Sequence, residues 1–220
     1  MNYKLGIFGG MGPSATCSLY QRIIDHTVAC CDQDHIKMVI LNNCDTPDRT
    51  LALTKNGEDP LPYLNEGIKT LVSLGCEYFV IPCNTAHAFS KGFIMQDKIK
   101  FINMVEEEKK KLSLYQDKKV CVLCTNGTRN THIYDSPNLD IGYPNNQDMV
   151  MQVVTNTKAG LDELKSLQKV IDEEKDYDIF LLDCTELSLY KERHKTSKLI
   201  IDAMDVLTES VIKACGKEYK

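Results

Sequence analysis

The sequence lacks the features that would place the protein in a membrane or on nucleic acid. No apolar run reaches the roughly 20 residues that a membrane-spanning helix requires, and Met1–Phe8 lacks the apolar core of a signal peptide. The formal net charge is −5, whereas phosphate backbones select basic surfaces. The one basic cluster, Lys109–Lys111, directly follows Glu106–Glu108, a block typical of a solvated helix face. We therefore expect a cytoplasmic protein with no nucleic-acid partner and no membrane attachment.

Motifs for metals and nucleotides are also missing. There is no second CxxC to pair with the first and no HExxH among the histidines, so we expect no metal site. The glycine turn Gly9–Pro13 lacks the full GxGxxG pattern and the Lys-Ser/Thr ending of a phosphate loop, which argues against a nucleotide cofactor. A better use for this turn is close backbone approach to a small carboxylate.

Cysteine, by contrast, is abundant, with ten in 220 residues. Nothing points to secretion, so we interpret most of them as small buried hydrophobic residues rather than disulfide partners. Cys121 and Cys124 form a CxxC, but they lie in an apolar run that is typical of a strand. Residues three apart on a strand point to opposite faces, so this pair is not expected to chelate a metal or form a redox couple.

Short apolar runs alternate with amphipathic stretches along the chain, which predicts an α/β fold with parallel sheets covered by helices. Such sheets bind ligands at the carboxyl ends of their strands. The expected strands are Lys4–Phe8, Lys37–Leu41, Tyr78–Pro82, Val120–Cys124 and Ile179–Asp183. The expected helices are Ala15–Val28, Tyr63–Leu74, Gln147–Asn156, Leu161–Glu173 and Leu199–Ala214.

The chain also repeats itself weakly. Lys4–Thr16 resembles Lys119–Thr131, since each has a strand that runs into a turn of small residues. Tyr78–Thr85 resembles Ile179–Glu186, since each has a strand that ends in a cysteine followed by polar residues. The alternative is chance similarity of βα units. The repeat predicts two pseudo-symmetric α/β domains, residues 1–103 with about 203–220 and residues 104–202, with the active site in the cleft between them.

Two cysteines hold matched places in this repeat, Cys83 and Cys184. Cys83 precedes a plausible helix start, where the positive end of the helix dipole stabilises a thiolate; a buried strand-end thiol is the alternative. Racemisation needs one group to remove a proton from one face of a carbon and another to return a proton to the other face. A pair of cysteines with similar, lowered pKa values suits that symmetry.

Several motifs together resemble the aspartate/glutamate racemase family in order and spacing. The resemblance covers nearly the whole chain. It implies a two-domain fold, a homodimer, and racemisation of an acidic amino acid without cofactor or metal, with Cys83 and Cys184 as the catalytic pair. The motifs are Gly9–Pro13, Pro47–Thr50, Pro82–His87, Thr125–Thr128, Pro144 with Gln147, Lys158 with Gly160, and Cys184–Glu186.

The same resemblance implies the substrate-binding set. Arg49 and Lys158 match positions that recognise the side-chain carboxylate, which suits a guanidinium fork and a second point charge. The alternatives are an ion pair of Arg49 with Asp48 or Asp45, and a solvated helix-end lysine. Glu186 either orients the ammonium group or caps a helix, and His87 either tunes Cys83 or is structural. The expected substrate-binding residues are Met11, Arg49, Asn84, Thr85, Ala86, Thr125, Thr128, Lys158, Thr185 and Glu186.

Two positions depart from the family pattern around the second cysteine. Asp183 stands where the family usually has glycine, and Leu187–Leu189 lacks the proline often found there. A carboxylate that pointed into the cleft would raise the pKa of the Cys184 thiol, whereas strand alternation could turn it outward. Three alternatives therefore stay open: a broader-range racemase, another small-dicarboxylate isomerase of the superfamily, and a non-catalytic protein that binds acidic amino acids.

Overall fold

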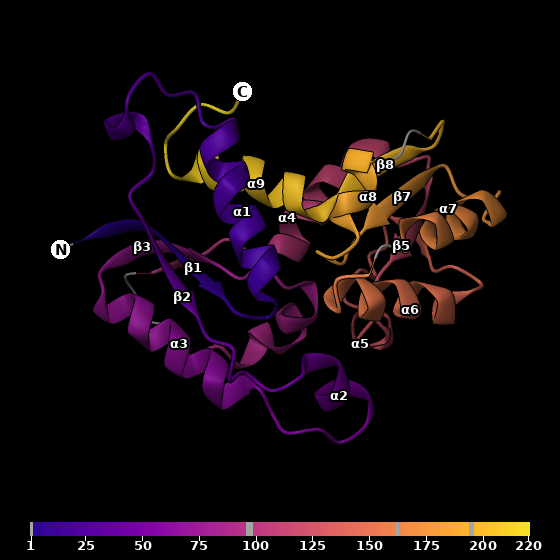
Figure 1. Cartoon of the computed structure of the whole chain (residues 1–220), viewed down its shortest axis with the longest axis horizontal. Helices are drawn as coiled ribbons and strands as arrows, with labels where there is room; N and C mark the ends of the chain where they lie inside the picture. The colour runs from indigo at the N-terminus through magenta and orange to yellow at the C-terminus, as the bar shows by residue number, and fades with distance from the viewer. Residues whose placement is uncertain (1, 96–98, 162, 194–195) are drawn as a thin grey trace.

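The fold contains two parallel sheets. A computed structural model describes residues 2–95, 99–161, 163–193 and 196–220. Each sheet has four strands, and the two lie in separate halves of the molecule (Figure 1). The first sheet has the order β2-β1-β3-β4, with β1 Tyr3–Gly9, β2 Met38–Asn42, β3 Cys76–Val80 and β4 Lys100–Phe101. The second has the order β6-β5-β7-β8, with β5 Lys119–Leu123, β6 Asp140–Gly142, β7 Ile179–Leu182 and β8 Leu199–Asp202.

The two sheets are built alike. Strands β1 and β5 hold equivalent places, and so do β3 and β7, because the strand orders match when each half is numbered from its own start. All pairings are parallel. The predicted α/β class with two pseudo-symmetric parallel sheets is confirmed, and the strand ends that carry Cys83 and Cys184 are equivalent.

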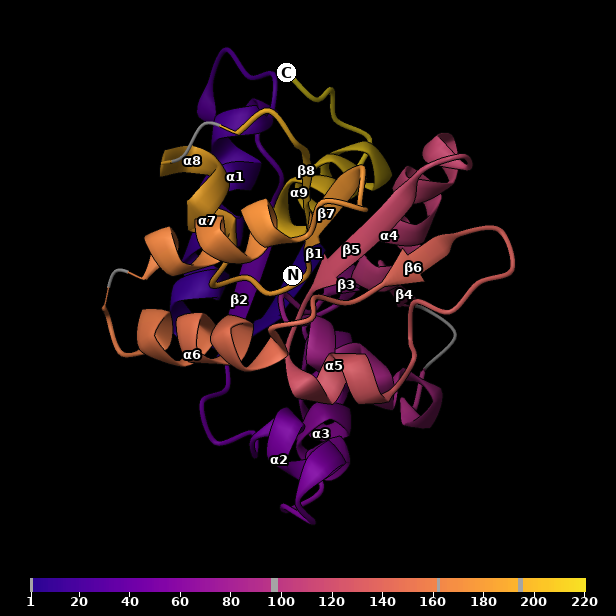
Figure 2. The same cartoon turned by 90° about the vertical axis from the view of Figure 1, so that its right-hand side faces the viewer.

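Helices cover both faces of each sheet, as Figures 1 and 2 show. Helices α1 and α9 pack on one face of the first sheet and α3 on the other. Helices α6 and α7 cover one face of the second sheet, and α4 covers the other. The helices are α1 Pro13–His26, α2 Arg49–Thr54, α3 Leu61–Ser73, α4 Met104–Leu112, α5 Asn126–Asn130, α6 Gln147–Lys158, α7 Leu164–Glu173, α8 Ser188–Arg193 and α9 Ala203–Ala214, with 3-10 turns at η1 Asp32–Asp34, η2 Asn84–Gly92 and η3 Ser113–Tyr115.

The end of the chain returns to the first sheet. Met204 and Leu207 of α9 share one apolar cluster with Leu5 and Ile7 of β1. Residues after 202 therefore pack with the N-terminal half, the arrangement that the predicted division of the chain requires. The boundaries of that division stay a prediction.

The helix predicted over Leu199–Ala214 is wrong in its first turn. Leu199–Asp202 is strand β8, and α9 begins at Ala203. The carboxylate of Asp202 accepts a hydrogen bond from the Met204 N–H at 3.0 Å and so caps the helix. The helix predicted over Leu161–Glu173 begins at Leu164, and residue 162 lies outside the described residues.

The acidic and basic block on α4 is only partly a solvated face. Glu106 and Glu107 pair with lysines at the surface, as expected. Glu108, however, is fully buried. It lies one turn from Met104 and from Leu112, both of which face the core, so it points inward with them.

Cys121 and Cys124 lie on opposite faces of the second sheet, because they belong to different apolar clusters. The prediction that the two side chains point to opposite faces is confirmed. In the part of the chain that the structure describes, no helix combines the length and the apolar character needed to cross a bilayer.

Candidate active site

The predicted site residues converge on one small cavity between the two halves. The cavity measures about 20 Å³, room for about one water molecule. Asp48, Thr50 and Asp183 also line it. Ala86 is buried in the first core, and Thr128 sits behind Thr85 and Thr125. The predicted residues that line the cavity are Met11, Arg49, Cys83, Asn84, Thr85, Thr125, Lys158, Cys184, Thr185 and Glu186.

The two cysteines reach this cavity from equivalent strand ends. Cys83 follows β3 and directly precedes η2, so the predicted helix start is confirmed, as a 3-10 helix. Cys184 follows β7. Both side chains are buried, at 8% and 6% exposure. One cavity thus receives one thiol from each half of the molecule.

Cys184 is held as a thiol by its neighbour Glu186. Its Sγ–H donates to Glu186 Oε2 at 2.9 Å, and the Thr185 hydroxyl donates to the same oxygen at 3.2 Å. Burial raises the pKa of Cys184 well above its usual value, and the charge of Glu186 raises it further, while Lys158 opposes both. The expectation of a lowered pKa at Cys184 is therefore wrong for this closed cavity.

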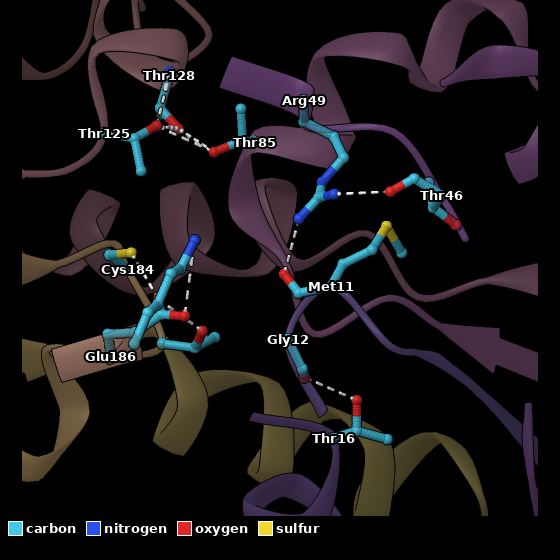
Figure 3. Close-up of polar contacts among 12 residues, drawn as sticks. Met11, Gly12, Thr16, Thr46, Arg49, Thr85, Thr125, Thr128, Cys184 and Glu186 are labelled. Atoms are coloured by element: carbon cyan, nitrogen blue, oxygen red, sulfur yellow. Dashed lines mark hydrogen bonds and ion pairs between the residues drawn. The ribbon is translucent and has the colours of Figure 1, made fainter. Parts of the chain in front are cut away.

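Glu186 and Lys158 form an ion pair at the cavity wall, with Lys158 Nζ 3.7 Å from Glu186 Oε1. Burial lowers the pKa of Lys158, but nearby negative charge, that of Glu186 first, raises it, and the pKa ends above its ordinary value. Lys158 therefore stays an ammonium group. Of the two interpretations of Glu186, the structure supports a place in the site, because its carboxylate contacts site residues (Figure 3).

His87 is structural and neutral. Burial lowers its pKa to about 4. Its Nε2 accepts from the Met104 N–H at 3.1 Å, so the ring proton is on Nδ1, which donates to the Cys83 carbonyl at 3.0 Å. His87 therefore fixes the backbone of Cys83 against the start of α4.

Three threonine hydroxyls form a cluster across the two halves (Figure 3). Thr85 Oγ1 lies 3.0 Å from Thr125 Oγ1 and 3.2 Å from Thr128 Oγ1, and the last two are 3.3 Å apart. Thr125 also caps α5 by accepting from the Thr128 N–H. Hydroxyl groups can rotate to donate, so this corner of the cavity suits a carboxylate.

Arg49 is anchored by the backbone around it. Its Nη1 donates to the Thr46 carbonyl at 3.1 Å, and its Nη2 donates to the Met11 carbonyl at 3.1 Å (Figure 3). Nη1 also donates to the Pro47 carbonyl at 2.9 Å. Asp48 caps α2 through the Leu51 N–H instead of pairing with Arg49. Arg49 Nε is buried without a partner among the described residues. The guanidinium is thus held in place with its Nε–H available to a ligand.

The turn before α1 brings two backbones together. Gly10 has φ +95°, and a Cβ there would lie 2.3 Å from the carbonyl oxygen of Asn43. Only glycine fits. The backbone at Gly10 therefore lies against the loop that follows β2, and this loop leads to Arg49. The same turn positions the Met11 carbonyl, which accepts a hydrogen bond from Arg49.

Asp183 belongs to a buried polar network that sequence reasoning missed. Asn84 Nδ2 donates to Glu108 Oε1 at 2.9 Å and also to Asp183 Oδ1, and the hydroxyl of Tyr134 contacts both carboxyl groups. Burial raises the pKa values of Asp183 and Glu108, and the charge of each acts on the other. The spacing of Glu108 from Met104 and Leu112 was the signal that could have found its inward direction.

Two larger cavities flank the small one. One measures about 410 Å³ and shares Met11, Arg49 and Glu186 with it; the other measures about 660 Å³ and shares Thr50 and Thr125. Lys158 lines all three. Across the described residues, no three His, Cys, Asp or Glu side chains are grouped so that they could hold a metal ion.

Comparison with known proteins places this geometry in context. The profile of the Asp/Glu/Hydantoin racemase family matches residues 8–211. The broad specificity amino-acid racemase RacX of Bacillus subtilis (strain 168) is 26% identical over 228 residues, which cover 94% of this chain and 96% of that relative. The solved structure of Picrophilus torridus aspartate racemase superposes with a TM-score of 0.90 at 33% identity, over 99% of this chain and 96% of that one. Glutamate racemase RacE1 of Bacillus anthracis shares the fold, with a TM-score of 0.68 at 14% identity over 96% and 82% of the two chains.

Proposed function

The chain belongs to the Asp/Glu/hydantoin racemase family, and from that membership we propose that it interconverts L- and D-aspartate or glutamate, with Cys83 and Cys184 as base and acid on opposite faces of the α-carbon. One observation carries this proposal: both thiols, at equivalent strand ends of two equivalent sheets, line the same cavity.

Because Cys184 is a thiol hydrogen-bonded to Glu186, we take it as the proton donor in the first direction of the proposed reaction. In the proposed reaction, the Cys83 thiolate removes the α-proton, and the Cys184 thiol delivers its own proton to the opposite face. Cys184 then becomes a thiolate, which the ammonium of Lys158 stabilises. In the reverse direction the Cys184 thiolate removes the α-proton, and the Cys83 thiol delivers its own proton to the opposite face. The pair reaches this state when the Cys184 proton passes to solvent through Glu186, which is already hydrogen-bonded to its Sγ, and Cys83 takes up a proton from solvent.

The donors on the cavity wall favour a substrate with two carboxylates. In the proposed complex the threonine cluster holds one carboxylate, and the Arg49 Nε–H with the Lys158 ammonium holds the other; the hydroxyl cluster, the unpartnered Nε and the shared cavity support this. A charge-assisted hydrogen bond of this kind is stronger than a neutral one. The Bacillus relative is named for broad specificity, so the substrate panel below includes neutral amino acids.

Substrate entry requires the cavity to open. About 20 Å³ is far smaller than the roughly 300 Å³ or more of small-molecule sites. Lys158 lines both flanking cavities as well as the small one, so displacement of the Lys158–Glu186 pair would open the small cavity toward them. Closure around the substrate then excludes water and strengthens the electrostatic contacts inside. Assembly as a homodimer stays a prediction.

Replacing either cysteine with alanine tests the two-base mechanism. Cys83→Ala and Cys184→Ala should each abolish racemisation, as measured by chiral chromatography of L- and D-aspartate, L- and D-glutamate and a panel of neutral amino acids. Each variant should still exchange the α-proton of one enantiomer with deuterium, because one base remains. Cys121→Ala, a buried thiol outside the cavity, is the matched control. Full racemisation in either active-site variant would refute the two-base mechanism, and activity on maleate alone would favour a dicarboxylate isomerase.

A further inference from the structure

The buried network around Asp183 contains more acceptors than hydrogens. The Asn84 amide carries two hydrogens and the Tyr134 hydroxyl carries one. Tyr134 Oη contacts both Glu108 Oε2 and Asp183 Oδ1, yet its single hydrogen serves one of them. The other contact is favourable only when the carboxyl group itself carries a proton. Glu108 and Asp183, which both contact this one hydroxyl, therefore share at least one proton.

The network also leaves one side-chain oxygen of Asn84 and one of Asp183 without a partner among the described residues. Asn84 turns its Nδ2 toward the two carboxyl groups. Its Oδ1 is buried and has no partner among the described residues. Asp183 uses its Oδ1 in the network, and its Oδ2 is likewise buried without a partner there. Asn84 and Asp183 both line the cavity, so their unpartnered oxygens are the side-chain atoms that remain free to accept a hydrogen bond from a ligand.

Two acceptors select one part of an acidic amino acid. At neutral pH both of its carboxylates are acceptors, and the ammonium group is its only strong donor. An oxygen acceptor beside a carboxylate would repel it, whereas an ammonium group would satisfy both orphaned atoms. In the proposed complex, the hydrogen-bond donors of Arg49, Lys158 and the threonines already bind the two carboxylates of the substrate.

We infer that Asp183, kept as a neutral carboxylic acid by Glu108 and Tyr134, forms with Asn84 the acceptor pair that binds the substrate ammonium group. This inference rests on the proposed function, since it presumes an amino-acid substrate. It explains an aspartate next to Cys184: a protonated carboxyl group accepts a hydrogen bond without placing a negative charge beside the thiol. The charge that acts on Cys184 is that of Glu186 instead.

The test compares L-aspartate with succinate, which has the same two carboxylates and no ammonium group. In Asp183→Ala, the KM for aspartate should rise about 10- to 100-fold, the worth of a hydrogen bond to a charged group, and the Ki of succinate should stay within about threefold of wild type. Asp183→Asn keeps an acceptor oxygen at that place and should restore the KM to within about threefold. Equal weakening of both ligands, or an unchanged KM, would overturn the inference. Asp202→Asn, at a buried aspartate outside the cavity, is the control.

A second measurement does not depend on the alanine variant folding. Infrared difference spectra of the wild type should show the carbonyl band of a protonated carboxyl group, which shifts with L-aspartate, does not shift with succinate, and is lost in Asp183→Asn. A carbonyl band whose frequency does not change when L-aspartate binds would also overturn the inference. Wild-type deuterium exchange is measured in parallel: absence of exchange refutes the proposed function, whereas the aspartate-to-succinate comparison judges Asp183 separately.

Discussion

Replacing Glu186 with glutamine tests the proposed chemistry at one atom. The change keeps the shape of the side chain and removes the carboxylate that accepts the Cys184 proton at 2.9 Å. It also removes the charge that faces Lys158. That pair is partly exposed, so its loss should cost less than about 1 kcal/mol of stability. The variant should fold, and its defect should lie in catalysis.

Two opposing effects set the magnitude. Loss of a positioned proton acceptor lowers a rate by about 100- to 10,000-fold. Removal of the negative charge makes the Cys184 thiolate easier to form, and a change of one pKa unit is worth about tenfold. The first effect is larger, so kcat should fall by about 10- to 1,000-fold. Enantiomers have equal free energies, so kcat/KM must fall by the same factor in both directions, which checks the data internally.

The discriminating assay is deuterium exchange followed by proton NMR. The enantiomer whose α-proton faces Cys83 should keep its exchange in Glu186→Gln, and its mirror image should lose most of it. Glu106→Gln removes a comparable carboxylate from a surface pair with Lys109 and should change neither rate. Wild-type kcat, or an equal loss of exchange from both enantiomers, would show that Glu186 does not serve Cys184.

Two further predictions concern stability. Burial in the folded protein lowers the pKa of His87 to about 4, so folding favours the neutral imidazole. The stability that the folded protein gains from a neutral His87 is complete above pH 6.5 and is lost as the pH falls through the folded-state pKa. Between pH 6.5 and 4, the free energy of unfolding of the wild type relative to His87→Gln should fall by about 3 kcal/mol, and a constant difference in urea titrations would contradict this. Tyr134→Phe, which removes a hydroxyl shared by Glu108 and Asp183, should cost about 1–3 kcal/mol. Its control is Tyr143→Phe, whose hydroxyl has no partner among the described residues and should cost less than about 0.5 kcal/mol; equal costs would refute the importance of the network.

The sequence pattern was informative where physical signals were long or repeated. Apolar runs predicted the central strands, and the repeated strand endings predicted that Cys83 and Cys184 occupy equivalent places. It failed where a signal was short or ambiguous. Strands β4 and β6 are too brief for an alternating pattern. Leu199, Ala203 and Leu207 recur every four residues, as on a helix, and this concealed the capping role of Asp202.

The buried polar network around Asp183 could not be predicted from the sequence, for a different reason. Glu108 lies in a run of charges whose composition indicates solvent, and only its register with Met104 and Leu112 shows that it faces inward. The protonation of Asp183 depends on its contacts with Asn84 and Tyr134, which also contact Glu108. These residues are far from Asp183 in the chain and meet only in the folded molecule. Composition alone could predict neither.

The return of α9 to the first sheet bears on the order in which the protein takes shape during translation. Leu5 and Ile7 are synthesised before the second sheet, but their partners Met204 and Leu207 are synthesised after it. The strands β5 to β8 are all synthesised before α9. The usual order, in which N-terminal units fold first, should therefore be reversed, with the second sheet acting as the early folding unit. A chain that stopped before residue 203 would leave this apolar face of β1 covered by α1 without α9.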